Sequence, residues 1–255
     1  MITSKWSHII WGVGLSATLC CSIACAEEPA PPPPPPPPPW SGSFNFGLTA
    51  ASGNSRSYSG NASADAKYKK DPSELRATAS VVYGKSDGSI STSKAMGTVH
   101  YSYLLTERVS GYLAGGVERD GLADLNLRVT VGPGAGYYFI KRPDATLVGE
   151  LGVNYFSDKF LNQSTKNYLT MRVAERGEWK ISGTAKFWET ANFFPALNNL
   201  ATDFHYLVMG EAGLETTVTT HTTMRFVVQD SYDSEPASGR RPNDTTYLAT
   251  IGYKF

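Results

Sequence analysis

Histidine side chains are the first candidates for chemistry in this sequence, because an imidazole can act as a base beside a hydroxyl or a carboxylate. After residue 26 the chain has three of them, His100, His205 and His221. His205 and Glu211 fall on one predicted strand, where a rise of roughly 3.3 Å per residue separates them by about 20 Å. The sequence has no H-E-x-x-H zinc motif and no D-x-D-x-D-G calcium loop. We therefore expect structural histidines and no catalytic, cofactor-binding or metal site.

Cysteine chemistry is confined to the start of the chain, where Cys20, Cys21 and Cys25 lie. This region has a basic residue, Lys5, an apolar run over Ile9–Leu19 and the small-x-small sequence Ala24-Cys25-Ala26. The pattern is typical of a secretory signal peptide over residues 1–26, with a lipoprotein signal that modifies Cys25 as the alternative. We expect an exported protein without thiol chemistry in its mature domain.

Charged side chains recur at alternate positions further along the chain, opposite apolar and aromatic residues. Because side chains alternate between the two faces of a strand, this spacing places the charges on one face. Both signs are mixed, so the side chains could pair with one another across an interior. The set, a candidate charge ladder, is Asp65, Lys67, Arg76, Glu118, Arg128, Glu150, Arg172, Lys186, Glu211 and Arg225.

The elements that would carry this ladder are β-strands. From Trp40 onward the sequence alternates with a period of two, and turn residues interrupt it roughly every 18 residues. We predict twelve strands, an even number that returns the chain to its starting side. The clearest strand is Leu125–Ile140, in which Pro133 and three neighbouring glycines predict a kink or a close approach of backbones. The fold class expected is all-β, an antiparallel transmembrane β-barrel of about 12 strands over residues 40–255.

A proline-rich segment separates this domain from the signal peptide. Residues 31–39 are nine consecutive prolines, which adopt polyproline II and reach about 28 Å at roughly 3.1 Å per residue. Residues 27–39 are therefore predicted to be a semi-rigid periplasmic linker, with a docking motif for a periplasmic partner or a stalk near peptidoglycan as alternatives that the sequence does not separate.

The chain ends on a strand with one aromatic and apolar face. Within Asp244–Phe255 this face consists of Tyr247, Ala249, Ile251, Tyr253 and Phe255. A last strand that stops on Phe resembles the closing strand of bacterial outer-membrane barrels, which the barrel-assembly machinery reads. Tyr247, Ile251, Tyr253 and Phe255 are the residues we assign to that role.

Alternation alone does not separate a membrane barrel from a soluble β-sandwich. Strand length favours the barrel, since 9–11 tilted residues span a membrane. Loop lengths do too: the turns at Lys141–Asp144 and Thr219-Thr220 are short, whereas Ser157–Lys166, Asn192–Leu200 and Asp233–Asn243 are long and polar. The formal net charge is zero, which gives no indication of nucleic-acid binding.

Several segments resemble the DUF481 family, also known as YdiY-like or salt-stress-induced outer-membrane proteins. They are Trp40-Ser41-Gly42, residues 51–55, residues 103–108, residues 115–120 and residues 132–139. The resemblance covers the mature domain from about Trp40 to Phe255 and implies an outer-membrane barrel without a catalytic motif. The proline run is not part of the family pattern.

These observations predict a barrel of the outer membrane that serves a structural, stress-related role or forms a narrow passive pore. Its expected partners are membrane lipid and the barrel-assembly machinery. Two alternatives remain: an outer-membrane enzyme that uses a lumen or rim histidine, and a soluble periplasmic β-sandwich that binds a partner.

Overall fold

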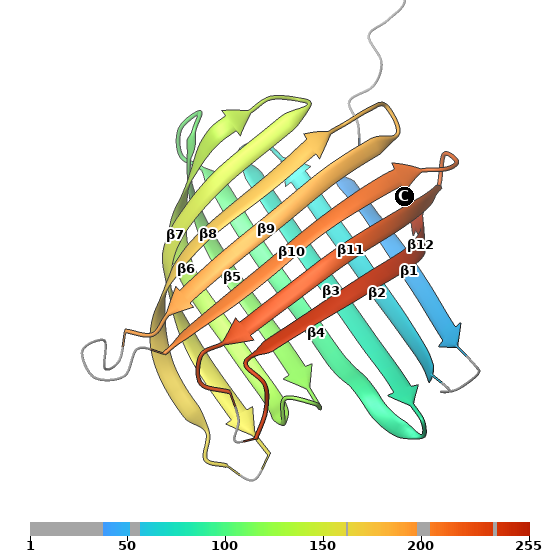
Figure 1. Ribbon diagram of the computed structural model, residues 1–255. Coiled ribbons are helices and arrows are strands. Elements are labelled where there is room, and N and C mark those ends of the chain that lie inside the picture. Colours follow the sequence, from blue (N-terminus) through green and yellow to red (C-terminus); the bar gives the residue numbers. More distant parts are fainter. Residues whose placement is uncertain (1–37, 52–56, 162, 198–204, 237–238) are drawn as a thin grey trace, which may run out of the picture. The chain divides into compact units, whose positions relative to one another are not determined.

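The computed structural model describes residues 38–51, 57–161, 163–197, 205–236 and 239–255 (Figure 1). The predicted signal peptide and all but the last two residues of the predicted linker lie outside these ranges. The described residues contain no helix that is long and apolar enough to cross a membrane. They form twelve strands: β1 (Trp40–Ala51), β2 (Ser57–Lys70), β3 (Ser73–Ser86), β4 (Ser89–Leu104), β5 (Val109–Asp120), β6 (Leu125–Lys141), β7 (Ala145–Phe160), β8 (Lys166–Lys180), β9 (Ala185–Pro195), β10 (Tyr206–Thr217), β11 (Thr222–Asp233) and β12 (Asn243–Lys254).

The strands form one closed antiparallel barrel in which each strand pairs with its neighbours in sequence and β12 pairs with β1. At this closure Ser43 pairs with Lys254 and Phe46 with Ile251. The backbone amides of Gly42 and Phe255 donate to each other's carbonyls at 3.1 and 3.0 Å. Closure leaves no unpaired sheet edge, so the predicted twelve-stranded barrel is confirmed and the two-sheet sandwich is wrong.

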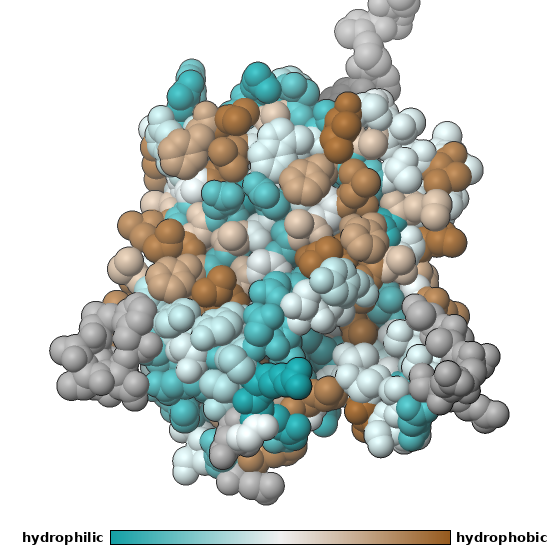
Figure 2. Space-filling view, viewed as in Figure 1, coloured by the Kyte–Doolittle hydropathy of each residue, from teal (hydrophilic) through white to brown (hydrophobic). Residues whose placement is uncertain are grey.

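The two faces of the wall differ in the way the alternation predicts. On β6, Leu127, Val129 and Val131 are 37–46% exposed, whereas Arg128 between them is 5% exposed. Figure 2 shows apolar side chains spread over the outside of the barrel. Exposed aromatic residues lie near both ends of the strands, among them Trp40, Tyr101, Tyr137 and Tyr253 at one end and Tyr58, Tyr83, Tyr155 and Tyr247 at the other. An apolar outer band between aromatic girdles is the wall that a membrane-spanning barrel requires.

Two carboxylates interrupt this outer band on adjacent strands. Glu175 on β8 pairs with Ala191 on β9, and Glu189 on β9 pairs with Gly177 on β8. Both point away from the interior, because the neighbouring Arg176 contacts interior Glu150 and the neighbouring Trp188 contacts interior Glu211. Glu175 is exposed and has no ion pair within the described part of the chain. A charge at this position faces hydrocarbon at a free-energy cost.

The barrel has a terminal end, where β1 begins and β12 ends, and an opposite loop end. The connections 142–144, 181–184 and 218–221 at the terminal end are shorter than 196–205 and 234–242 at the loop end. This agrees with the predicted asymmetry, although several strand ends differ. Strand β7 continues to Phe160 and β9 to Pro195, so the loops predicted to begin at Ser157 and Asn192 begin later, and the first of them is only 161–165.

The predicted close approach on β6 is present at its glycines. A Cβ on Gly134 would lie 2.3 Å from the Tyr112 ring and 2.5 Å from the Leu151 carbonyl oxygen, and a Cβ on Gly152 would lie 2.4 Å from the Tyr112 hydroxyl. Tyr112 of β5 therefore lies flat against the inner wall of β6 and β7 because these positions have no side chain. This arrangement places an aromatic ring beside the charged groups of the interior.

Candidate functional site: the polar interior of the barrel

Ion pairs between strands that are not neighbours show which side chains occupy the interior. Asp65 on β2 contacts Arg225 on β11 at 2.6 Å, and Arg76 on β3 contacts Glu178 on β8 at 3.9 Å. In a closed barrel such contacts can form only through the lumen. These pairs therefore narrow the passage at different heights.

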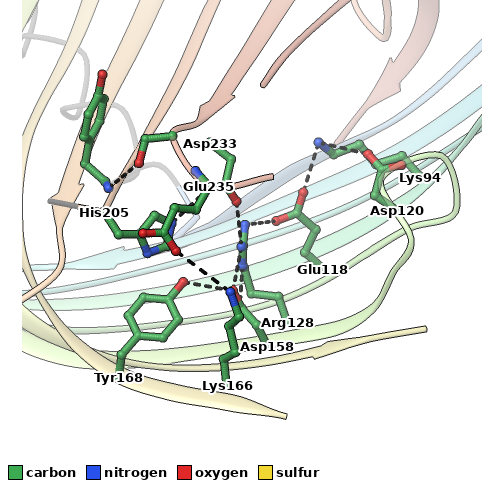
Figure 3. A network of polar contacts seen from close by, with 12 residues as sticks. Lys94, Glu118, Asp120, Arg128, Asp158, Lys166, Tyr168, His205, Asp233 and Glu235 are labelled. Atoms are coloured by element: carbon green, nitrogen blue, oxygen red, sulfur yellow. Dashed lines mark hydrogen bonds and ion pairs between the residues drawn. The ribbon is translucent and has the colours of Figure 1, made fainter. Parts of the chain in front are cut away.

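The densest group of contacts, which we call the Arg128 network, lies near the loop end (Figure 3). Arg128 donates Nε–H to Asp158 Oδ1 at 2.8 Å and Nη2–H to Asp158 Oδ2 at 2.7 Å. It also reaches Asp233 of β11 at 3.4 Å and Glu118 at 3.8 Å. A two-pronged guanidinium–carboxylate contact is among the strongest polar interactions in proteins. The contact with Asp158 holds β6 to β7, and the contact of Arg128 with Asp233 connects β6 to the opposite wall of the barrel.

Further polar groups complete this network. Tyr168 donates its hydroxyl to Asp158 at 2.8 Å, and His205 Nε2 lies 3.0 Å from Asp233 Oδ1. Lys94 forms ion pairs with Glu118 at 3.0 Å and with Asp120 at 3.7 Å. Every carboxylate that surrounds Arg128 therefore has a second partner. A cavity of about 40 Å³ remains beside the network, lined in part by Lys94, Glu118 and Arg128.

Apolar residues support the network from the same side of the lumen. Phe156, Phe194 and Leu207 form a buried cluster with exposures of 1–8%. The Arg128 guanidinium carbon lies 5.8 Å from the centroid of the Phe156 ring. Burial lowers the local dielectric, which strengthens the ion pairs and raises the cost of leaving either partner alone.

A second cluster centres on Glu150 of β7. Arg172 donates Nη1–H to Glu150 at 2.7 Å, and Arg176 approaches the same carboxylate at 3.4 Å. His100 Nε2 lies 3.2 Å from Glu150 Oε1, which makes an ion pair when the imidazole is protonated. The Tyr112 ring stacks on His100 at 5.0 Å and on the Arg172 guanidinium at 5.2 Å. Glu150 thus connects β4, β7 and β8.

The remaining ladder residues lie in two groups. At the terminal end Glu74 pairs with Lys67 and Arg76. On the β9–β11 side Glu215 pairs with Lys186 and with Arg225.

Glu211, the last ladder residue, differs from the others. Its two oxygens accept hydrogen bonds from Trp188 Nε1–H and Gln229 Nε2–H, each at 2.8 Å. No cation lies within ion-pair distance of Glu211 among the described residues.

The inner wall of β3 and β4 is less crowded. Thr78 and Thr98 face the lumen beside Arg76 and His100, are exposed, and share a hydrogen bond of 2.7 Å. The buried charged groups of the described residues lie on β5–β7 and β10 instead. The hydroxyls of Thr78 and Thr98 are therefore accessible to solvent in the lumen, on a wall that also holds Arg76 and His100.

The structure brings the predicted ladder residues into contact with several groups that the sequence did not single out. The sequence pattern places Asp158 and Asp233 in the loops Ser157–Lys166 and Asp233–Asn243, and it predicts a strand that ends at Glu175, before Arg176 and Glu178, whereas β8 continues to Lys180. These residues could have been assigned to strands by continuing the alternation past the apolar part of each predicted strand. Their partners could not be read from the alternation, because it gives the face of a residue and not the strand opposite.

The histidines do not form a catalytic arrangement within the described residues. His100 and His205 each face a carboxylate, and neither imidazole hydrogen-bonds to a serine or threonine hydroxyl there. His221 packs against the Tyr253 ring at 5.4 Å. The described residues contain no group of three or more His, Cys, Asp or Glu that could hold a metal ion.

One sequence segment matches a hydrolase pattern by its letters alone. Gly84-Lys85-Ser86-Asp87-Gly88 reads G-x-S-x-G and contains G-K-S. In the structure it forms the end of β3 and the turn into β4, where Asp87 and Gly88 have φ values of 50° and 82°. A serine-hydrolase nucleophile (G-x-S-x-G) and a phosphate-binding loop (which contains G-K-S) each require a helix directly after the motif, and here a strand follows.

Outside the spanning strands, one ion pair connects two loops of the loop end. Arg240 donates Nε–H and Nη2–H to the two oxygens of Asp124, both at 2.8 Å. These hydrogen bonds hold the pKa of the Asp124 carboxyl below its ordinary value. The loop after β11 is thereby held against the loop after β5.

The C-terminal residues Tyr247, Ile251, Tyr253 and Phe255 all lie on the outer face of β12 and are 54–68% exposed. The Phe255 ring lies 5.7 Å from that of Phe44 on β1. Their side chains are therefore accessible at the closure of the barrel.

Solved barrels resemble this structure at low sequence identity. The translocator domain of the autotransporter NalP from Neisseria meningitidis is 13% identical, with coverage of 85% of this chain and 86% of that one and a TM-score of 0.44. The COG4313 outer membrane channel from Pseudomonas putida F1 is 11% identical, with coverage of 84% and 93% and a TM-score of 0.44. An anion-selective porin from Comamonas acidovorans is 10% identical, with coverage of 85% and 98% and a TM-score of 0.40.

No curated protein matches the sequence. The family model described as "Protein of unknown function, DUF481" matches residues 44–255, which include all of the described strands except the first residues of β1. The chain therefore belongs to the DUF481 family.

Proposed function

We propose that this protein is an outer-membrane barrel that forms a narrow passive pore for small ions. The observation that carries the proposal is the interior itself: ion pairs cross it at several heights, while the hydroxyls of Thr78 on β3 and Thr98 on β4 stay accessible to solvent. A twelve-stranded barrel is too wide to be filled by aliphatic side chains and narrower than the large porins. Ion-paired side chains narrow such a lumen and keep it hydrated.

The outer-membrane location rests on three supports. The N-terminus has the pattern of an export signal, the outer wall is apolar between aromatic girdles, and the last strand ends on an exposed Phe255. We propose that residues 1–26 are removed on export, that residues 27–39 form a periplasmic linker, and that the barrel-assembly machinery reads β12. On this orientation the terminal end faces the periplasm. The resemblance that implies a role in salt stress is compatible with a pore whose interior is held by charges.

Conductance in planar lipid bilayers tests the pore. The purified, folded barrel should produce small ohmic steps, and Arg128→Glu and Glu150→Lys should each enlarge them because reversal breaks the bridges around the substituted residue. Lys159→Glu, on the exposed outer face of β7, is the matched charge reversal that leaves the interior intact. A wild-type barrel without conductance, or equal steps in all four proteins, contradicts the proposal.

A further inference from the structure

The charges of the lumen are nearly, but not completely, balanced. Interior carboxylates on β2–β9 and β11, among them Asp65, Glu118 and Asp158, have a Lys or Arg within 4 Å. Glu211 has none in the described structure. It is the sixth of the twelve residues of β10, which places it midway between the two ends of the barrel.

Glu211 is fixed in position by donors that carry no charge. Trp188 and Gln229 each donate one hydrogen bond, so both carboxylate oxygens are oriented but neither is neutralised. A carboxylate has about four acceptor sites, and Glu211 is only half-buried. Its free acceptor sites are therefore available to ions and water in the lumen.

The cationic side chains nearest to Glu211 already form ion pairs with other carboxylates. Arg225 and Lys186 lie 5.5 and 5.9 Å from the centroid of the Trp188 ring that contacts Glu211. Arg225 is bound by Asp65 and Glu215, and Lys186 is bound by Glu215. Two positive and three negative charges therefore meet here, and the excess is one negative charge.

Two other groups in the described lumen are also unbalanced: Arg172 and Arg176 share the carboxylate of Glu150, and the Arg128 network near the loop end has four carboxylates for Lys94 and Arg128. The other interior charges without an ion pair lie at the mouths. Asp244 is the second residue of β12 at the loop end, and Lys69 and Lys254 are at strand ends of the terminal end. The facing wall at mid-height offers the neutral hydroxyls of Thr78 and Thr98. Charges at an open mouth are screened within about 8–10 Å at physiological salt, whereas a charge inside a narrow lumen acts on every ion that passes.

We propose that Glu211 makes the pore selective for small monovalent cations such as K⁺ over anions such as Cl⁻. The proposal rests on the proposed pore function and adds a selectivity residue to it. A fixed carboxylate that has no cation of its own attracts a passing cation and repels an anion at the same position. The surrounding hydroxyl and amide oxygens can replace part of the hydration shell of the cation.

The test is the reversal potential of the folded barrel in a planar bilayer under a KCl gradient. Wild type should reverse toward the K⁺ equilibrium potential, and Glu211→Gln should lower the K⁺/Cl⁻ permeability ratio about fivefold, as expected for one charge near the ion path in an aqueous lumen. Thr78→Lys supplies a compensating charge from the exposed opposite wall without touching the hydrogen bonds of Glu211, and should lower the ratio similarly. Lys159→Gln removes a charge from the exposed outer face of β7, outside the lumen, and should keep the wild-type ratio.

The outcomes separate this inference from the function on which it rests. Absence of conductance in wild type overturns the proposed pore, and the selectivity with it. Conductance with the same reversal potential in wild type, Glu211→Gln and Thr78→Lys leaves the pore standing and overturns the role of Glu211. A shift in Glu211→Gln and in Thr78→Lys, together with an unshifted Lys159→Gln variant, supports it.

Discussion

Removal of the Arg128 charge should destabilise the barrel more than removal of Arg128 and its main partner together. The side chains of Arg128 and Asp158 are only 6% and 2% exposed, and two hydrogen bonds of 2.8 and 2.7 Å join them. Arg128→Met keeps most of the volume of the side chain but leaves Asp158 with Tyr168 as its remaining donor. A buried charge that loses its partner costs about 3–5 kcal/mol. Asp233 and Glu118 keep His205 and Lys94, so Asp158 should account for most of this cost.

The double variant Arg128→Met/Asp158→Asn removes both charges at once. Replacing a whole buried pair is often close to neutral, because the desolvation of both ions is avoided. We therefore expect a loss of about 1–2 kcal/mol, mainly from the hydrogen bonds that are no longer made. The coupling free energy between the two positions should be about 2 kcal/mol or more.

Reversible urea unfolding of the barrel in lipid vesicles can be followed by tryptophan fluorescence. It gives the free energy of unfolding of the wild type, of Arg128→Met, of Asp158→Asn and of the double variant. Arg172→Met is a matched control, since its partner Glu150 retains Arg176. The control should lose less stability than Arg128→Met. A loss below about 1 kcal/mol for Arg128→Met, or a double variant as unstable as the single one, would refute the view that this network is a tightly coupled buried pair.

Three further outcomes follow from the geometry. Glu175→Leu should stabilise the barrel in vesicles by about 1–2 kcal/mol in urea unfolding, because the carboxylate faces the apolar band without an ion pair. Gly134→Ala should cost about 1–3 kcal/mol in the same assay, because its Cβ would lie 2.3 Å from the Tyr112 ring. A carboxyl NMR titration should show Asp124 with a pKa below its ordinary value. The contribution of its pair with Arg240 to stability is then present above the ordinary carboxyl range and is lost as pH falls through the lowered value, and Arg240→Gln should return the pKa to the ordinary range.

Much of the barrel could be predicted because its wall obeys a local rule: side chains along each strand alternate between an apolar outer face and a polar inner face. The alternation of small and polar residues over 57–70 is unbroken and Pro72 follows in the next turn, so the sequence predicts a strand with the bounds that β2 has. The rule weakens where a strand leaves the apolar band. Beyond Phe156 the outward residues of β7, Ser157 and Lys159, are polar, and the inward ones include apolar Phe160, so the alternation ends before the strand does.

The partners within the candidate site depend on non-local geometry. Alternation predicts that Arg128 faces the interior, but its contact with Asp233 joins residues 105 positions apart. That contact is set by the number of strands and by the register of every pair between β6 and β11. A sequence pattern with a period of two contains no information on this stagger, which fixes where opposite walls meet.

The ion pairs across the lumen also explain how a wide barrel keeps its cross-section. Hydrogen bonds of the sheet join only neighbouring strands, so they do little to resist flattening of a closed ring. Contacts such as Arg76–Glu178 and Asp65–Arg225 join opposite or distant walls and supply that resistance. The contacts differ in strength along the axis: Arg76 and Glu178 are 28% and 36% exposed and 3.9 Å apart, whereas the Arg128–Asp158 contact is short and buried. Solvent screens the first far more than the second. The cross-section of the lumen is therefore restrained most strongly at the loop end, by Arg128–Asp158. It is restrained most weakly at the terminal end, where a passing ion can compete with Arg76 for Glu178.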